Sequence, residues 1–178
     1  MSEAHRASNG AAAWPVWSFA LAILLSAFLL FQVQPMIGRY ILPWFGGTPA
    51  VWSTVMLFFQ VLLTGGYAYA NWLIRPNRRR EIVHLVLLGI SAALMIGLGL
   101  TWKSPITPGA AWKPTGEVFP VWEIFKLLVV SVGLPYFLLS SNSPLMQAWF
   151  HRRFPEKTAY RLYALSNVGS FLALISYP

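Results

Sequence analysis

The sequence of 178 residues contains no cysteine and no aspartate, and its acidic residues number only five. Without cysteine there is no disulfide, no thiolate metal ligand, no cysteine nucleophile and no iron–sulfur cluster. The shortage of aspartate and glutamate removes most carboxylate chemistry as well. Charged residues make up only 10% of the chain, whereas 57% of it is hydrophobic and 16% is aromatic. A soluble domain of this length could not bury so much apolar surface, so the sequence predicts an integral membrane protein.

The chain has an excess of basic residues, with a formal net charge of +8. In a soluble protein such an excess would suggest a nucleic-acid partner. Here the basic residues lie in short segments between apolar runs, and membrane topology explains that arrangement better. We therefore expect the lipid bilayer as the surrounding partner and no nucleic acid.

Five apolar segments follow a short polar tail. About 20 apolar residues suffice to cross a bilayer as a helix. The fifth segment stops inside apolar sequence, which predicts that the natural protein continues beyond Pro178. The expected fold is all-α: a polytopic transmembrane helix bundle with four complete spans and a fifth at the C-terminal end. The expected units are a cytoplasmic tail over residues 1–13 and a transmembrane domain over 14–178, with spans at 14–37, 50–73, 82–102, 121–150 and 160–178.

Prolines and small residues predict where these helices end and where they approach one another. Pro35, Gly38 and Pro43 interrupt the first apolar segment, so we expect its helix to end near residue 37. Glycine and alanine at intervals of four allow the backbones of two helices to come close. The third span carries such a ridge, for which helix packing is the expected role: Gly89, Ala93 and Gly97.

The distribution of lysine and arginine predicts how the chain is oriented, because cytoplasmic loops retain these residues. Alternate segments place nine of them on one side of the membrane and four on the other. The side with nine is expected to be cytoplasmic, together with the amino terminus. The nine are Arg6, Arg75, Arg78, Arg79, Arg80, Arg152, Arg153, Lys157 and Arg161, and the four are Arg39, Lys103, Lys113 and Lys126.

The stretch GLPYFLLSSNSPLMQAW, residues 133–149, contains the best site candidate. Four consecutive polar residues, 140–143, precede Pro144 deep in an apolar run. Pro144 removes a backbone donor and clashes with the carbonyl of Ser140, so we expect the helix to kink or open between these two residues. Broken backbone at membrane depth persists only when packed in protein or lining a wet cavity. Interhelical packing and a solute site are both consistent with this pattern, and packing is the commoner role.

Two other spans carry polar faces. On the second span Ser53, Gln60, Thr64, Tyr67 and Asn71 fall in a stripe roughly 60° wide at 100° per residue. Such a stripe should point into a bundle interior or cavity rather than toward lipid. The fifth span has a similar face that includes Asn167. The candidate polar intramembrane site therefore comprises Gln60, Thr64, Ser140, Ser141, Asn142, Ser143 and Asn167.

The sequence shows no catalytic apparatus. No phosphate-binding glycine loop lies in a strand–turn–helix context, and neither a serine–histidine–acid constellation nor a zinc-binding H-E-x-x-H motif is present. His84 lies in a span, but a membrane haem normally needs axial ligands and the other histidines fall outside the spans. The alternative that stays open is His84 as the single protein ligand of a haem or pigment. We therefore predict no catalytic, cofactor-binding or metal residues, and the cofactor content is unknown.

Several long stretches resemble a known family. They are LLSAFLLFQVQPMIGRYILPWFGGTPAVWSTVMLFFQVLLTGGYAYA, AAWKPTG, GLPYFLLSSNSPLMQAWF and YRLYALSNVGSFLALISYP, which together cover about residues 17–178. These resemble the membrane half of bacterial spermidine synthase-like proteins, also described as fused major-facilitator/spermidine synthase proteins. The resemblance implies a multi-pass protein of the bacterial cytoplasmic (inner) membrane. The resemblance implies that a soluble part similar to aminopropyltransferases follows, binding decarboxylated S-adenosylmethionine and a polyamine. None of that part's acidic residues or nucleotide loop has a matching position here.

Three functions are consistent with these observations. The first is an integral membrane structural or accessory module, whose polar faces pack within its own bundle or against other membrane subunits. The second is part of a major-facilitator-like transporter lining a solute path, although RPNRRR, residues 75–80, lacks the acidic and glycine pattern of that signature. The third is the membrane domain of an aminopropyltransferase-like enzyme whose catalytic part lies downstream. Enzymatic activity of the whole protein is therefore undecided at this point.

Overall fold

The computed structural model describes residues 16–75, 77–102, 104, 106–114, 120–157 and 160–177. Within these residues the secondary structure is entirely helical, as the sequence predicts. The predicted tail, residues 1–13, lies outside them. The elements in chain order are α1 (Val16–Phe45), α2 (Pro49–Ile74), α3 (Arg78–Trp102), the short helix η1 (Ala110–Trp112), α4 (Pro120–Leu128), the π turn η2 (Val129–Gly133), α5 (Leu134–Arg153) and α6 (Tyr160–Ser176).

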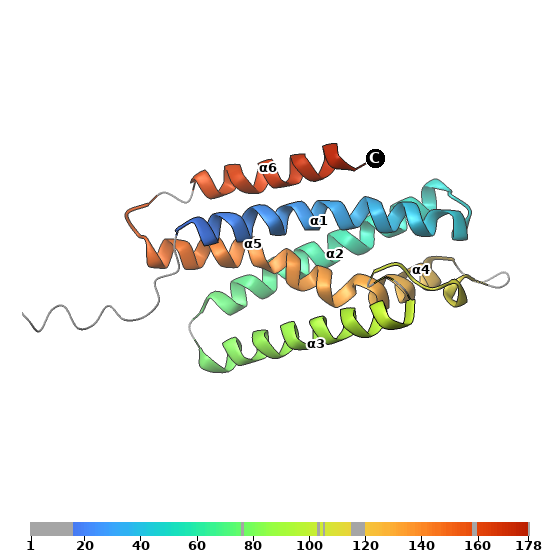
Figure 1. Cartoon of the computed structure of the whole chain (residues 1–178), viewed down its shortest axis with the longest axis horizontal. Coiled ribbons are helices and arrows are strands. Elements are labelled where there is room, and N and C mark those ends of the chain that lie inside the picture. Colours follow the sequence, from blue (N-terminus) through green and yellow to red (C-terminus); the bar gives the residue numbers. More distant parts are fainter. Residues whose placement is uncertain are drawn as a thin grey trace, which may run out of the picture.

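The long helices form a bundle with α1, α2 and α5 at its centre (Figure 1). Helix α5 crosses α2 and also packs along α1. Helix α6 runs beside α1 on one edge of the bundle, and α3 lies on the opposite edge against α5 (Figure 1). The two edge helices therefore cover the central three only in part.

Four segments are long and apolar enough to cross a membrane: α1 with 30 residues, α2 with 26, α3 with 25, and the continuous run of 33 residues from Val121 to Arg153. The chain is therefore a membrane module with four candidate spans. Helix α6 has 17 residues, fewer than a full crossing at about 20. The fifth span stays a prediction.

The first helix is longer than the sequence predicts. The expected end near residue 37 is wrong, because α1 continues through Pro35 and Pro43 to Phe45. Membrane helices tolerate proline where neighbouring elements support the backbone. Here the Tyr177 hydroxyl donates to the carbonyl of Pro35 over 3.3 Å. The chain turns instead at a pair of glycines with positive φ, Gly46 (92°) and Gly47 (62°), a conformation that side chains disfavour.

The start of α2 follows directly from local chemistry. Thr48 precedes the helix in an extended conformation, and its hydroxyl accepts the N–H of Val51 over 3.4 Å. Threonine in this position satisfies one of the backbone donors that a helix start leaves free. Pro49 follows as the first helical residue, where its missing N–H costs nothing.

The irregular turn of the fourth span is not where the sequence places it. The expected opening between Ser140 and Pro144 is wrong, since α5 is a continuous α-helix through Pro144. The irregular turn is η2, which lies immediately before the start of α5 at Leu134. Pro135 cannot donate to the carbonyl of Ser131, and a π turn with its i→i+5 bonding accommodates that loss.

The apolar core has one large and two small clusters. The large cluster lies where α1, α2, α4 and α5 meet, and it includes Ile37, Phe59, Leu128 and Tyr136. A second joins α1, α5 and α6, and a third joins α2 and α5. Helix α3 contributes almost nothing to these clusters, and its only buried residue is Ser91.

The two predicted cytoplasmic loops lie at the same end of the bundle (Figure 1). There the guanidinium of Arg152 donates to the carbonyl of Ile74 at the end of α2. Arg80 donates to the carbonyl of Trp72 over 2.6 Å and lies 4.7 Å from the centre of its ring. Arginine thus satisfies carbonyls that the last turn of a helix leaves free. The shared end agrees with the charge pattern, while the side of the membrane it occupies stays a prediction.

Candidate functional site

The predicted polar stretch of α5 lies at the junction of four helices. A small cavity of about 40 Å³ is present there. Its apolar walls come mainly from α1. Its polar lining comes from all four helices: Ser26 of α1, Tyr67 of α2, Ser140 and Ser143 of α5, and Ser166 of α6.

Hydrogen bonds within the protein occupy most of the polar groups in this stretch. The Asn142 carboxamide donates to the hydroxyl of Ser26, which itself donates to the carbonyl of Ala22 over 2.6 Å. Ser140 and Ser141 are buried, and each donates to a carbonyl three residues earlier in α5 over 2.7 Å. The hydroxyl of Ser143 accepts from Gln147 over 3.3 Å. The side chains of 140–143 therefore all have partners inside the chain.

Ser140 also marks a very close crossing of two helices. Its hydroxyl lies 3.3 Å from the carbonyl of Leu62 in α2. A methyl group built on Gly66 of α2 would lie 1.8 Å from that hydroxyl and 2.9 Å from the carbonyl of Phe137. Such close approach of two backbones requires glycine and is typical of membrane helix packing. The geometry here is that of a helix–helix contact.

Three of the predicted site residues lie elsewhere. Gln60, Thr64 and Asn167 are exposed in the described structure, and the Thr64 hydroxyl donates to the backbone carbonyl of Gln60 over 2.9 Å. Within the described residues these three side chains therefore do not pair with 140–143, although Tyr67 of the same α2 stripe lines the small cavity. The expectation that these faces meet protein or a cavity rather than lipid stays a prediction for the three. The physical reason for the missing pairs on α2 is that this helix packs through a different, more apolar face, which includes Val55, Phe59, Gly66, Ala70 and Leu73.

Sequence reasoning missed two participants, Ser26 and Ser166. Ser26 is buried in the middle of α1, where it interrupts an otherwise apolar run. That isolation was the available signal, because a lone hydroxyl in a span usually faces other helices. Ser166 is a neighbour of Asn167 on α6, and the sequence alone could not decide which of the two points toward α1.

A second polar contact joins α1 and α5 further along the bundle. The Gln34 carboxamide donates to the hydroxyl of Tyr136, which is 1% exposed. Nearby in sequence, the side-chain oxygen of Gln32 in α1 and the hydroxyl of Ser131 in η2 are buried without a hydrogen-bond partner among the described residues. Unpaired buried groups of this kind cost roughly 1–3 kcal/mol each.

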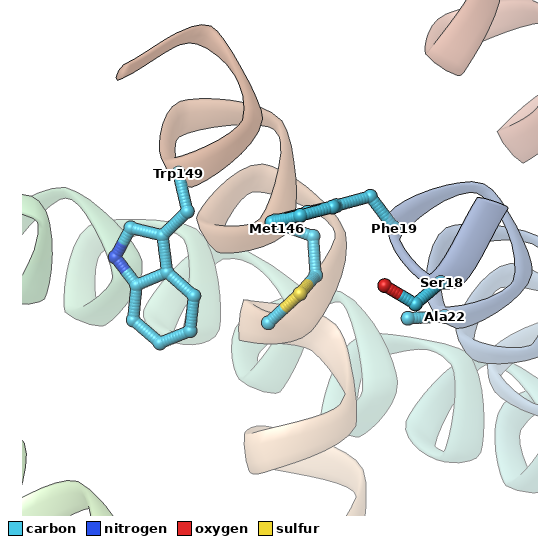
Figure 2. Close-up of a pocket in the computed structure, with 5 residues that line it drawn as sticks. All are labelled: Ser18, Phe19, Ala22, Met146 and Trp149. Carbon is cyan, nitrogen blue, oxygen red and sulfur yellow. The ribbon is translucent and has the colours of Figure 1, made fainter. Parts of the chain in front are cut away.

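An apolar groove of about 230 Å³ lies between α1 and α5, separate from the polar junction. Figure 2 shows Met146 and Trp149 of α5 on one side of it, facing Ser18, Phe19 and Ala22 of α1. The Phe19 ring also meets the ring of Phe150 edge-on at 5.8 Å. Such a lining suits hydrocarbon, because it offers few polar groups to orient a polar solute.

The described residues contain no group of three or more histidine, cysteine or acidic side chains close enough to hold a metal ion. His84 of α3 has a protein partner: its Nδ1 atom lies 3.1 Å from the hydroxyl of Tyr69. Comparisons of the chain with family models, curated proteins and solved structures found no match.

Proposed function

We propose that the chain is an integral membrane structural or accessory module rather than a solute pathway. The observation that carries this proposal is the protein pairing of the polar groups at the four-helix junction. Ser140, Ser141, Asn142 and Ser143 all make hydrogen bonds within the bundle. The bonds of the three serines lie within α5, whereas the bond from Asn142 to Ser26 joins α5 to α1. Interhelical polar contacts in membranes are worth about 0.6 kcal/mol each on average.

The size of the cavity supports the same conclusion. Sites for small molecules usually enclose about 300–1,000 Å³. The junction leaves about 40 Å³. Each water needs roughly 10–15 Å³ of such volume, so the space suits at most about three waters. A transporter would need this region to open much wider than it is in the described conformation.

Cysteine accessibility can separate packing from transport, because residues 1–178 contain no cysteine. With Ser143→Cys in the full-length chain in membranes, we expect almost no reaction with a membrane-impermeant thiol reagent. The matched control is Asn77→Cys in the exposed loop after α2, which should react rapidly and only from the cytoplasmic side. Ready labelling of Ser143→Cys from either side would overturn the structural proposal, and labelling of Asn77→Cys from outside would overturn the proposed orientation.

The sequence resemblance supports a second candidate, the membrane domain of a spermidine synthase-like enzyme with its catalytic part downstream. The supporting feature is the set of long stretches over residues 17–178 that resemble that family. In that case the bundle would anchor an aminopropyltransferase-like domain to the bacterial inner membrane. Sequencing the complete gene tests this directly: an in-phase aminopropyltransferase-like frame after residue 178 supports it, and an immediate stop codon contradicts it.

A further inference from the structure

The apolar groove between α1 and α5 lies at the end of the bundle that carries the two basic loops. Its lining comes from the first turns of α1 and from the last turns of α5, where Met146 and Trp149 face Phe19 (Figure 2). Helix α5 ends at Arg153, one turn beyond Trp149. Tryptophan is enriched where a bilayer meets water. The groove therefore lies at the depth where the headgroup of a phospholipid joins its acyl chains.

Arg153 lies on the groove side of α5. At 100° per residue its direction falls between those of Met146 and Trp149, so its side chain leaves the helix one turn beyond the groove. Arg153 is exposed, and no ion pair or hydrogen bond between described residues involves its guanidinium. Arg152 differs, because its guanidinium donates to the carbonyl of Ile74. Arg153 thus offers an unpaired positive charge beside an apolar groove.

Positive charge dominates this end of the bundle, where the acidic residues among those described are Glu81 and Glu156. Glu81 lines a separate pocket with His84 of α3 and does not line the groove. An anionic group beside Arg153 therefore meets a surplus of positive charge. The basic residues at this end are Arg75, Arg78, Arg79, Arg80, Arg152, Arg153, Lys157 and Arg161.

Charge decides which molecule suits the groove. An acyl chain that enters it exchanges hydrocarbon for an equally apolar lining, so this transfer contributes little selectivity. The headgroup contributes more, because a guanidinium can donate two parallel hydrogen bonds to a phosphate. An apolar helix of another chain would fill the groove but leave the Arg153 guanidinium without a partner. Charge complementarity therefore favours a phospholipid with a net negative headgroup.

We propose that the groove between α1 and α5 binds one anionic phospholipid, with an acyl chain between the two helices and the phosphate on Arg153. The groove is separate from the polar junction, so this inference goes beyond the proposed function and does not depend on it. It requires that this end of the bundle lies at a membrane surface, on either side. A ligand that binds only the folded bundle also stabilises it.

Native mass spectrometry of the delipidated full chain tests the headgroup. The probes are phosphatidylglycerol, which is anionic, and phosphatidylcholine, which is zwitterionic, with identical acyl chains. We expect the first phosphatidylglycerol to bind about fivefold more tightly, equivalent to about 1 kcal/mol, the usual effect of one basic residue near a membrane surface. Arg153→Gln should abolish most of this preference.

The matched control for Arg153 is Arg79→Gln, which removes the same charge from the same end of the bundle. Arg79 is exposed, and at 100° per residue it lies on the side of α3 turned away from Glu81 and His84, which line the pocket beside Trp149. This variant should keep the preference for phosphatidylglycerol.

A larger side chain in the groove tests the position of the acyl chain. Ala22→Phe places a ring in the groove and should weaken the binding of both lipids about tenfold, the scale of overpacking costs. The matched control is Leu21→Phe, at a neighbouring position that is 47% exposed, and it should leave binding unchanged. Thermal unfolding of each variant without added lipid shows separately whether the chain is folded.

Four results would contradict the proposal. Equal affinity of the parent chain for the two lipids would mean that the groove does not select negative charge. An equal loss of preference in Arg153→Gln and Arg79→Gln would mean diffuse attraction to the basic end. Binding that survives Ala22→Phe would place the lipid outside the groove, and no tightly bound lipid at all would mean that further protein covers it. Failure of the proposed function remains distinguishable, because it appears as labelling of Ser143→Cys.

Discussion

The run from Val121 to Arg153 and helix α3 make an instructive pair, because both are long, apolar candidate spans with opposite surroundings. The most apolar stretch of 18 residues has a mean hydropathy of 1.8 in the run from Val121 to Arg153 and 2.3 in α3. Of these stretches, 56% is buried inside the chain in the run from Val121 to Arg153, and only 6% in α3. Average hydropathy therefore identifies a span without locating it in the bundle.

Polar and small residues separate the two spans. The first contains the serines and asparagine of 140–143, and these make hydrogen bonds to α1 and α5 itself. Helix α3 has the ridge of Gly89, Ala93 and Gly97, but a methyl group built on Gly89 or Gly97 meets nothing within 4 Å. The predicted packing role of this ridge is not fulfilled within the described chain.

The difference in burial between the two spans is tested most strongly by shortening one leucine side chain to alanine in each span. Leu145 is fully buried and Leu100 is 83% exposed. Leu145→Ala should destabilise the chain by about 2–5 kcal/mol, since it leaves a cavity among packed helices. Leu100→Ala should change stability by less than about 0.5 kcal/mol, as expected for an exposed site. Unfolding in detergent micelles measures both, and equal effects would contradict the assigned burial.

Adding a methyl group tests the helix crossing with a smaller expected effect. Gly66→Ala forces a methyl against Ser140 and the Phe137 carbonyl, and we expect it to cost about 1–3 kcal/mol. Gly89→Ala on α3 enters open space and should be neutral or stabilise by up to about 1 kcal/mol. The thermal midpoints of the two variants can be compared directly. A Gly66→Ala protein as stable as the parent would mean that α2 and α5 do not cross closely there.

The smallest expected effect concerns a single polar contact. A double-mutant cycle of Ser26→Ala and Asn142→Ala isolates the bond between these two side chains. We expect a coupling free energy of about 0.6 kcal/mol, and not above about 2, as for other interhelical contacts in membranes. The same cycle between Ser26 and Asn167, which is exposed on α6, should show no coupling. Equal coupling free energies in the two cycles would contradict the positions that the structure gives to the carboxamides of Asn142 and Asn167.

The sequence was sufficient to predict the helices of the spans and their order. Apolar runs with basic residues at their ends predict these helices. The bounds of α2 and α3 lie close to the expected 50–73 and 82–102. The end of α1 was not predictable from its prolines. Whether Pro35 or Pro43 stops a helix depends on neighbours such as Tyr177, which are distant in sequence.

The candidate site was predictable only in part. The stretch 140–143 indicated an interhelical position because consecutive polar residues in a span need partners, but the partners could not be identified. The stripe on α2 indicated a protein-facing surface without showing which protein. A helix with one apolar and one polar face can pack against its own bundle through either face. Helix α2 packs through its apolar face.

The most direct test of the central claim is to count ordered waters at the four-helix junction in an experimental structure of the chain in a lipid nanodisc. The claim is that Ser26, Ser140, Ser143 and Ser166 line a cavity of only about 40 Å³, too small for a solute path. We expect at most about three waters there, with no connection to either membrane surface. A continuous file of waters from this cavity to one surface would contradict the claim and favour a solute path.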